Sequence, residues 1–226
     1  MNTFSVGTAL RFGWETFKKR PWFLVGATLL VFVLSWIISA IQNAQSGVVA
    51  LGFVIFLAAL AVSTLIDMGF TALYLHAHDD VSKTSLNDLW HPKPFWQYLI
   101  ATILVGFLVI AGLILLIVPG LILVTLFAFV KFLIIDRNLG PIEAMKESVR
   151  ITRGHRLDLF LLILSLVAIN ILGAIALLVG LLLTVPVSVL ALVHAYRTLA
   201  RAASTAGTHE HAHTTQLPHT PHTSSI

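Results

Sequence analysis

Asp67 is the residue whose type and position offer the most chemistry, because it lies inside a long apolar segment. A carboxylate at the centre of a bilayer costs roughly 2.5–3.5 kcal/mol on insertion scales, so it is a functional hypothesis by default. Two interpretations stay open. In one, Asp67 lines a polar path and faces Asn170 or His194. In the other, it pairs with a lysine or arginine near the membrane surface, while Asn170 and His194 brace neighbouring helices by hydrogen bonds.

Histidines form a second group of candidate ligands. His76 and His78 precede two aspartates in "HAHDD", and His209, His211 and His213 alternate near the C-terminus. A His-x-His pair beside Asp binds zinc, copper or nickel weakly. Polar tails that are merely rich in histidine are more common. We therefore predict no metal site and no cofactor, and keep these five histidines as weak metal candidates.

Catalytic patterns are missing from the sequence. Cysteine is absent, which excludes a thiolate nucleophile and a disulfide framework. The serines and threonines within apolar segments have no base at helical spacing, and no HExxH or phosphate-loop motif occurs. We predict a protein that is not an enzyme and has no catalytic residues.

The composition defines the elements that must position these residues. Of 226 residues, 58% are hydrophobic and only 11% are charged, far below the roughly 25% charged residues of soluble domains. Apolar runs of about 20 residues are long enough for a helix to cross a bilayer. We predict an all-α, polytopic membrane domain over residues 1–203, followed by a disordered tail rich in His, Thr and Pro at 204–226. The six predicted spans are about 22–41, 48–75, 95–117, 121–135, 157–179 and 182–201.

The basic residues give the orientation. All but one of the 14 lysines and arginines lie before span one, between spans two and three, between spans four and five, or at the end of span six. The positive-inside rule therefore places both termini in the cytoplasm. The opposite loops are very short, so the spans should pair as three hairpins, with Pro119 and Pro186 each in the first turn of a returning helix. Basic residues that flank spans indicate topology, so we predict no nucleic-acid partner.

Two segments, about 5–19 and 141–153, have the pattern of amphipathic helices on the cytoplasmic surface. The second begins at Pro141 and presents a charged face, on which Glu147 is placed to pair with Arg150. Two interpretations remain: the helices anchor the bundle, or they bind an anionic lipid or a cytoplasmic protein. The face assigned to such a partner consists of Lys146, Glu147, Arg150 and Arg153.

Three stretches carry a resemblance to a known group. They are "FSVGTALRFGWETFKK", "LILLIVPGLIL" and "DRNLGPIEAMKESVRITRGH" followed by an "LLxVP" hairpin. Over residues 4–201 the chain resembles bacterial six-span membrane proteins of uncharacterised function, of the type named "glycerophosphoryl diester phosphodiesterase membrane domain". The resemblance implies the six-span fold and a bacterial inner-membrane location. It implies no activity, because the catalytic barrel of the phosphodiesterases needs on the order of 250 residues and is missing from this chain.

These observations favour a non-enzymatic inner-membrane protein that scaffolds or regulates envelope or lipid homeostasis. The alternative is a small transporter or channel in which Asp67 lies in a polar path between hairpins. The direction in which Asp67 points distinguishes the two. No pattern in the sequence specifies an oligomeric state.

Overall fold

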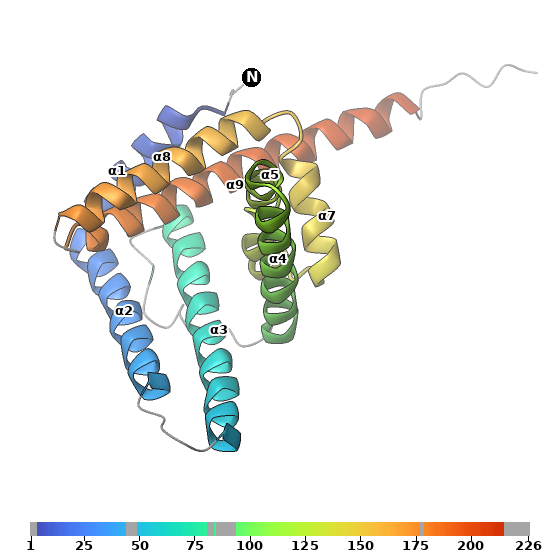
Figure 1. The fold of residues 1–226 in the computed structure, drawn as a ribbon. Coiled ribbons are helices and arrows are strands. Elements are labelled where there is room, and N and C mark those ends of the chain that lie inside the picture. Colours follow the sequence, from blue (N-terminus) through green and yellow to red (C-terminus); the bar gives the residue numbers. More distant parts are fainter. Residues whose placement is uncertain (1–3, 44–48, 81–83, 85–93, 177–178, 215–226) are drawn as a thin grey trace, which may run out of the picture.

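The computed structural model describes residues 4–43, 49–80, 84, 94–176 and 179–214, and every regular element among them is an α-helix (Figure 1). The helices are α1 Val6–Lys19, α2 Pro21–Asn43, α3 Val49–Asp80, α4 Phe95–Leu115, α5 Ile117–Leu126, α6 Val130–Arg137, α7 Pro141–Ile151, α8 Arg156–Ile175 and α9 Val179–Thr214.

Six helical stretches are long and apolar enough to cross a membrane. They are Pro21–Asn43, Leu51–Asp80, Phe95–Leu115, Val118–Arg137, Arg156–Ile175 and Gly180–Thr205. The expectation of an all-helical, multi-pass membrane protein with six apolar helical stretches is thus confirmed by length and composition.

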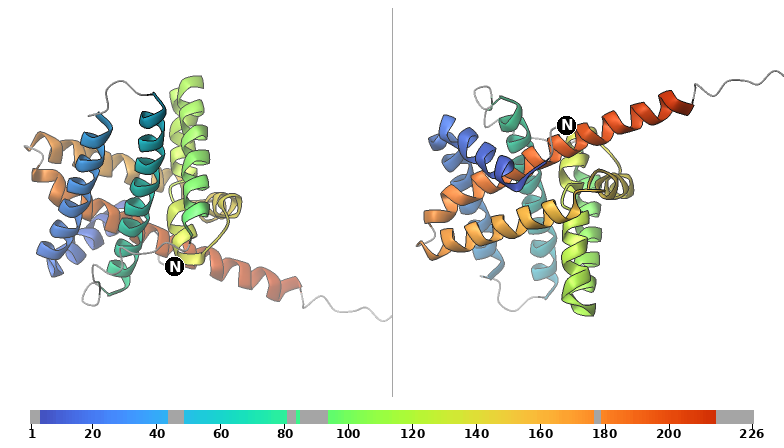
Figure 2. Two further views of the ribbon diagram at one scale, coloured as in Figure 1. Left: turned by 90° about the horizontal axis from the view of Figure 1, so that it is seen from below. Right: turned by 90° about the horizontal axis from the view of Figure 1, so that it is seen from above.

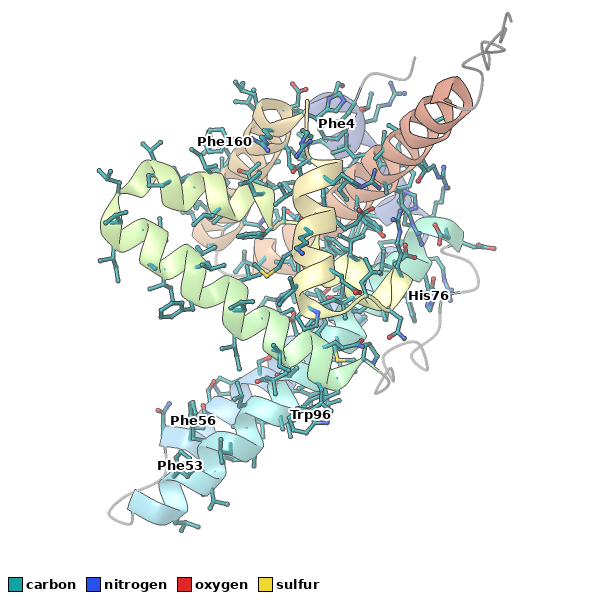
Figure 3. The ribbon with its side chains drawn as sticks, turned by 90° about the vertical axis from the view of Figure 1, so that its right-hand side faces the viewer. Phe4, Phe53, Phe56, His76, Trp96 and Phe160 are labelled. Carbon is teal, nitrogen blue, oxygen red and sulfur yellow. The ribbon has the colours of Figure 1, made fainter. Side chains whose placement is uncertain are left out.

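The long apolar helices are in contact in three pairs, α2–α3, α4–α5 and α8–α9. Figures 1 and 2 show that the three pairs extend in different directions from a common region. In Figure 3, the α2–α3 pair points downward while the α4–α5 pair points to the left. We call the common region the hub. It comprises α1, α6 and α7 together with α3 from Asp67 onward and α9 from Val187 onward. Helix α9 contacts α1, α3 and α7, and α6 contacts α3 and α7.

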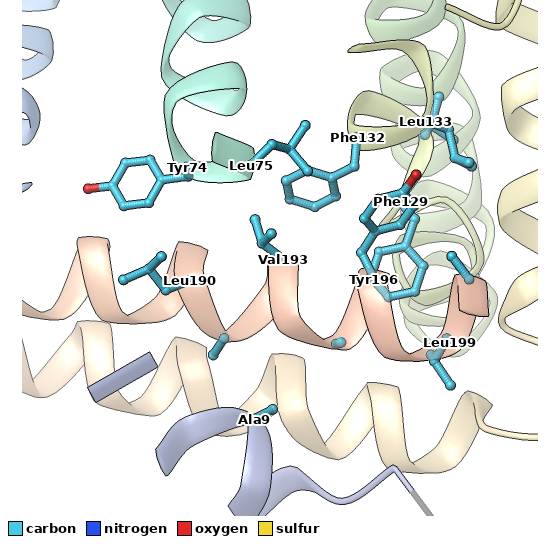
Figure 4. Close-up of a cluster of buried hydrophobic side chains, with 14 of the residues drawn as sticks. Ala9, Tyr74, Leu75, Phe129, Phe132, Leu133, Leu190, Val193, Tyr196 and Leu199 are labelled. Atoms are coloured by element: carbon cyan, nitrogen blue, oxygen red, sulfur yellow. The ribbon is translucent and has the colours of Figure 1, made fainter. Parts of the chain in front are cut away.

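The hydrophobic core lies in the hub. Tyr74 of α3, Phe129 just before α6, and Leu190 and Tyr196 of α9 are fully buried there (Figure 4). The outer parts of the helix pairs, by contrast, expose large apolar side chains, and Ile114 is 82% exposed. Such exposure suits contact with lipid tails, which are as apolar as leucine. The hub therefore packs its apolar side chains into a core, as a soluble protein does, whereas the helix pairs expose an apolar surface of the kind that faces lipid.

Helix α1 packs along α9 through small residues. Its buried positions include Ala9, Gly13 and Thr16, while Trp14 is 44% exposed. A Cβ added to Gly13 would lie 2.6 Å from the carbonyl oxygen of Val187. Glycine is therefore what lets the two backbones approach so closely. Only part of this helix remains free to contact a membrane surface, because its small-residue face is occupied by α9.

The fourth predicted span is not one helix. Helix α5 ends at Leu126, the chain turns, and α6 begins at Val130, whose amide donates to the carbonyl of Phe127 three residues earlier. The buried Ser148 of α7 reaches this break. Its hydroxyl donates to the carbonyl of Leu126 at 2.6 Å and accepts from the amide of Phe129 at 3.3 Å. A helix break needs such partners, because a freed backbone group is costly when buried.

One further expectation requires correction. Pro186 lies inside α9 instead of in its first turn, because α9 already begins at Val179. Helix α9 extends to Thr214, and the alanines after Arg201 are strong helix formers. Residues 215–226 lie outside the described part of the chain, and the disordered tail at 204–226 stays a prediction.

Candidate functional site

Asp67 is held by side chains from two other helices. Its Oδ2 accepts a hydrogen bond from the Tyr98 hydroxyl of α4 at 2.8 Å and one from the Lys131 ammonium of α6 at 2.5 Å. Thr71, one turn along α3, lies 3.3 Å from the same Tyr98 hydroxyl. Tyr98 is buried, whereas the Asp67 and Lys131 side chains are 43% and 44% exposed. The carboxylate is therefore charge-paired and partly exposed.

The ion pair lies where the surroundings of α3 change. Residues 49–66 precede it and form about 27 Å of helix at 1.5 Å per residue. From Met68 to Leu75, α3 is mostly buried in the hub, whereas His76 and Asp79 are exposed. Asp67 thus lies at the start of the buried part of α3, within the apolar stretch Leu51–Asp80.

Asn170 makes a different contact, between α8 and α9. Its Nδ2 donates to the Ser188 hydroxyl at 2.8 Å and to the carbonyl of Leu166 at 2.8 Å. Close by, Gly173 of α8 packs directly against Gly180 of α9. Small residues and an interhelical hydrogen bond are the usual means of holding membrane helices together. Asn170 therefore braces this helix pair.

His194 of α9 pairs with a histidine of α3. Its Nδ1 lies 3.3 Å from Nε2 of His78, and His78 Nδ1 lies 3.2 Å from Oδ1 of Asp79. The Phe12 ring of α1 stacks on His194 at 4.2 Å and contacts His78 at 4.6 Å between centroids. Asp67, Asn170 and His194 thus occupy three separate contacts, so the structure does not bring the three candidate residues together.

The metal candidates are not assembled either. His76 and His78 are two positions apart on α3, which places them on different sides of a helix, and His76 is exposed while His78 is half-buried. Across the residues that the structure describes, no three histidines, aspartates or glutamates are grouped to hold a metal ion. His209, His211 and His213 belong to the last turns of α9, where side chains are not described.

Sequence reasoning missed the ion-pair network around Arg197. The Arg197 guanidinium donates to Asp136 Oδ1 at 2.8 Å and to Asp79 Oδ2 at 2.7 Å, and the Tyr196 hydroxyl donates to Asp136 Oδ2 at 2.7 Å. These bonds connect α9, α6 and α3 in the hub. In the sequence, Arg197 is one of the basic residues that indicate topology, and Asp79 is a neighbour of the histidines in "HAHDD". Nothing in the sequence indicates that the two residues pair with each other. Charge-assisted bonds of this kind fix the mutual orientation of helices.

The charged face of α7 is partly used within the hub. Glu147 pairs with Arg150 at 2.6 Å, as the spacing predicts, and also with Arg137 of α6 at 2.9 Å. The hydrogen bond from Arg150 lowers the pKa of Glu147 more than partial burial raises it. Lys146 and Arg153 are exposed and form no ion pair within the described part of the chain. Only these two residues of the predicted partner face keep an unbalanced charge.

The fold and the polar contacts together define an all-helical, multi-pass membrane protein. Residues 107–203 match the family described as "Protein of unknown function (DUF975)". An uncharacterized protein of Mycobacterium bovis is 25% identical over 87% of this chain and 69% of its own length, and one of Mycobacterium tuberculosis is 24% identical over the same shares. No solved structure matches. These similarities support a relationship to uncharacterised proteins, and the resemblance to the phosphodiesterase membrane domain stays a prediction.

Proposed function

We propose that this chain is a non-enzymatic protein of a bacterial inner membrane, with both termini in the cytoplasm. In this proposal it scaffolds or regulates a process of envelope or lipid homeostasis by binding a cytoplasmic protein on the hub. The three helix pairs cross or enter the bilayer as hairpins and serve as its anchor.

The observation that carries the proposal is the distribution of charge. Every lysine and arginine that the structure describes belongs to the hub or to a helix end that joins it, and the outer parts of the helix pairs have none. By the positive-inside rule, the hub then faces the cytoplasm. Exposed cations that form no ion pair with a described residue remain on its outer helices, at Lys18 and Lys19 of α1, at Lys146 of α7 and at Arg153 just after α7. A surface of this kind suits an acidic partner.

The transport alternative needs Asp67 to face Asn170 or His194 across a cavity. The contacts described above support the structural role instead, because each of these three residues already has a partner on a neighbouring helix. We therefore do not retain transport as a second function.

The orientation is tested first, and the absence of cysteine makes this simple. A single cysteine in place of Asn43, at the outer end of α2, should react with a membrane-impermeant maleimide added from outside the inner membrane. A cysteine in place of Lys146 should react only after the membrane is opened. The reverse pattern would overturn the proposed orientation.

The partner is tested by pull-down of the full chain from gently solubilised native membranes. We expect one stoichiometric protein that is lost when Lys146 and Arg153 are both changed to glutamate and retained in Asp67→Asn. Reversal of Lys18 and Lys19 is the matched control, because it changes the net charge equally on a different helix. A stoichiometric partner unaffected by the α7 reversal, or the absence of any partner, would contradict the proposal.

A further inference from the structure

A groove of about 470 Å³ lies between α5 and α8. Its walls are the α5 residues between Val118 and Leu126 that share one side of that helix, and Arg156, Leu157 and Phe160 from the first turns of α8. Phe160 lies on α8 beside the α4–α5 pair (Figure 3). The groove therefore begins where α8 leaves the hub and follows α5 toward the outer end of its hairpin.

The walls are apolar along the whole groove apart from Thr125 and Arg156. Thr125 donates its hydroxyl to the carbonyl of Leu121 at 3.0 Å, so its own hydrogen bond is already made within α5. The interior therefore offers no free polar group to a ligand, and it suits a hydrocarbon chain.

The end of the groove nearest the hub is cationic. Arg156 is exposed and forms no ion pair with any residue that the structure describes. The nearest acidic residue on α8, Asp158, lies 3.5 Å from the His155 ring nitrogen, with which it can pair. Arg153, also exposed and without an ion pair, precedes it by three residues. The positive charge at this end is thus left unbalanced by the protein.

We infer that this groove binds one anionic phospholipid, with an acyl chain along α5 and the phosphate on Arg156. A guanidinium binds phosphate through two parallel hydrogen bonds. A phospholipid carries an anionic group at one end of a long apolar chain, which is the order of features found along this groove. A soluble anion would leave the apolar part empty. The site rests on Arg156 and the walls of the groove, which are not part of the partner face of the proposed function, and it needs no protein partner; Arg153 alone is near both.

Native mass spectrometry of the purified full chain in detergent tests the inference. The probes are phosphatidylglycerol and phosphatidylcholine with identical acyl chains. We expect one phosphatidylglycerol to be retained in preference to phosphatidylcholine, and Arg156→Gln to weaken its retention about tenfold, as for loss of a hydrogen bond to a charged group. Arg201→Gln is the control, since it removes an exposed arginine from α9. Equal retention of the two lipids, or equal loss in both variants, would overturn the inference.

The acyl-chain half of the site is tested separately. Ile122→Trp fills the groove and should reduce retention of phosphatidylglycerol, whereas Ile171→Trp, at an exposed position farther along α8, should leave it unchanged. A second measurement covers the case in which Ile122→Trp misfolds. Phe160→Trp places a fluorophore in the groove. One equivalent of phosphatidylglycerol with brominated chains should quench the fluorescence of this tryptophan more than that of a tryptophan introduced at Ile171. Equal quenching at the two positions would refute the site. A variant that loses the lipid but retains the protein partner would show that the lipid site and the proposed function can be tested independently.

Discussion

Replacement of Ser148 by alanine should lower the stability of the fold by more than is usual for the loss of one hydroxyl group. The Ser148 hydroxyl is the partner of both the Leu126 carbonyl and the Phe129 amide at the break between α5 and α6. Without it, one buried donor and one buried acceptor lose this bond, and each orphaned group costs about 1–3 kcal/mol. The helix break permits partial relaxation, so we expect a total loss of about 2–4 kcal/mol.

Thermal unfolding of the detergent-solubilised chain, followed by intrinsic tryptophan fluorescence, measures this loss. For a protein of this size, 1 kcal/mol corresponds to roughly 2–4 °C in Tm, so Ser148→Ala should lower Tm by about 4–16 °C. Ser165→Ala is the matched control, because the exposed Ser165 donates only to the carbonyl of Leu161 in its own helix. It should change Tm by less than about 2 °C. If the two variants unfold at the same temperature, α7 does not support the helix break as we describe.

Three further predictions use the same unfolding measurement. Gly13→Ala should destabilise the chain by about 1–2 kcal/mol, since overpacking against α9 exceeds the gain in helix propensity. Gly7→Ala, with nothing within 4 Å of the added Cβ, should be neutral or stabilising, and the opposite order would refute the close packing of α1. The pKa of Glu147 is lowered, so its ionised form should stabilise the fold above the ordinary pKa of 4.5, and this stability should be lost as the pH falls further. A Glu147→Gln variant should not show this loss of stability at acidic pH. A double-mutant cycle on Asp67 and Lys131 should give a coupling energy of only about 0.5–1 kcal/mol, because both side chains are more than two-fifths exposed. A much larger coupling energy would mean that the ion pair lies deeper in the membrane.

The number and approximate limits of the apolar helices could be predicted from the sequence, because hydrophobic length is set by the bilayer and needs no knowledge of packing. The pairing of Glu147 with Arg150 follows from helix spacing in the same local way. The break at Phe127–Phe129 could not be predicted, since its cause is a serine 22 residues from Leu126 on another helix. The same reason applies to Arg197, whose two carboxylate partners lie 61 and 118 positions away in the chain.

The choice between the two interpretations of Asp67 also depended on tertiary structure. Nothing local to Asp67 specifies which lysine or arginine is its partner. Once α4 and α6 pack beside α3, Lys131 and Tyr98 reach the same carboxylate oxygen. The polar residues of a membrane domain are thus the least predictable part of it, because each role depends on which helix lies opposite.

The packing of α1 against α9 has a consequence for biosynthesis. Helix α1 leaves the ribosome long before α9, because its partner surface around Val187 and Ala191 is synthesised more than 170 residues later. The helix pairs can insert into the membrane one after another, but the hub closes only after α9 has been made. Until then the small-residue face of α1 has no partner within the chain. An incomplete chain therefore exposes the small-residue face of α1, which a finished chain covers, and a protease or chaperone can recognise that difference.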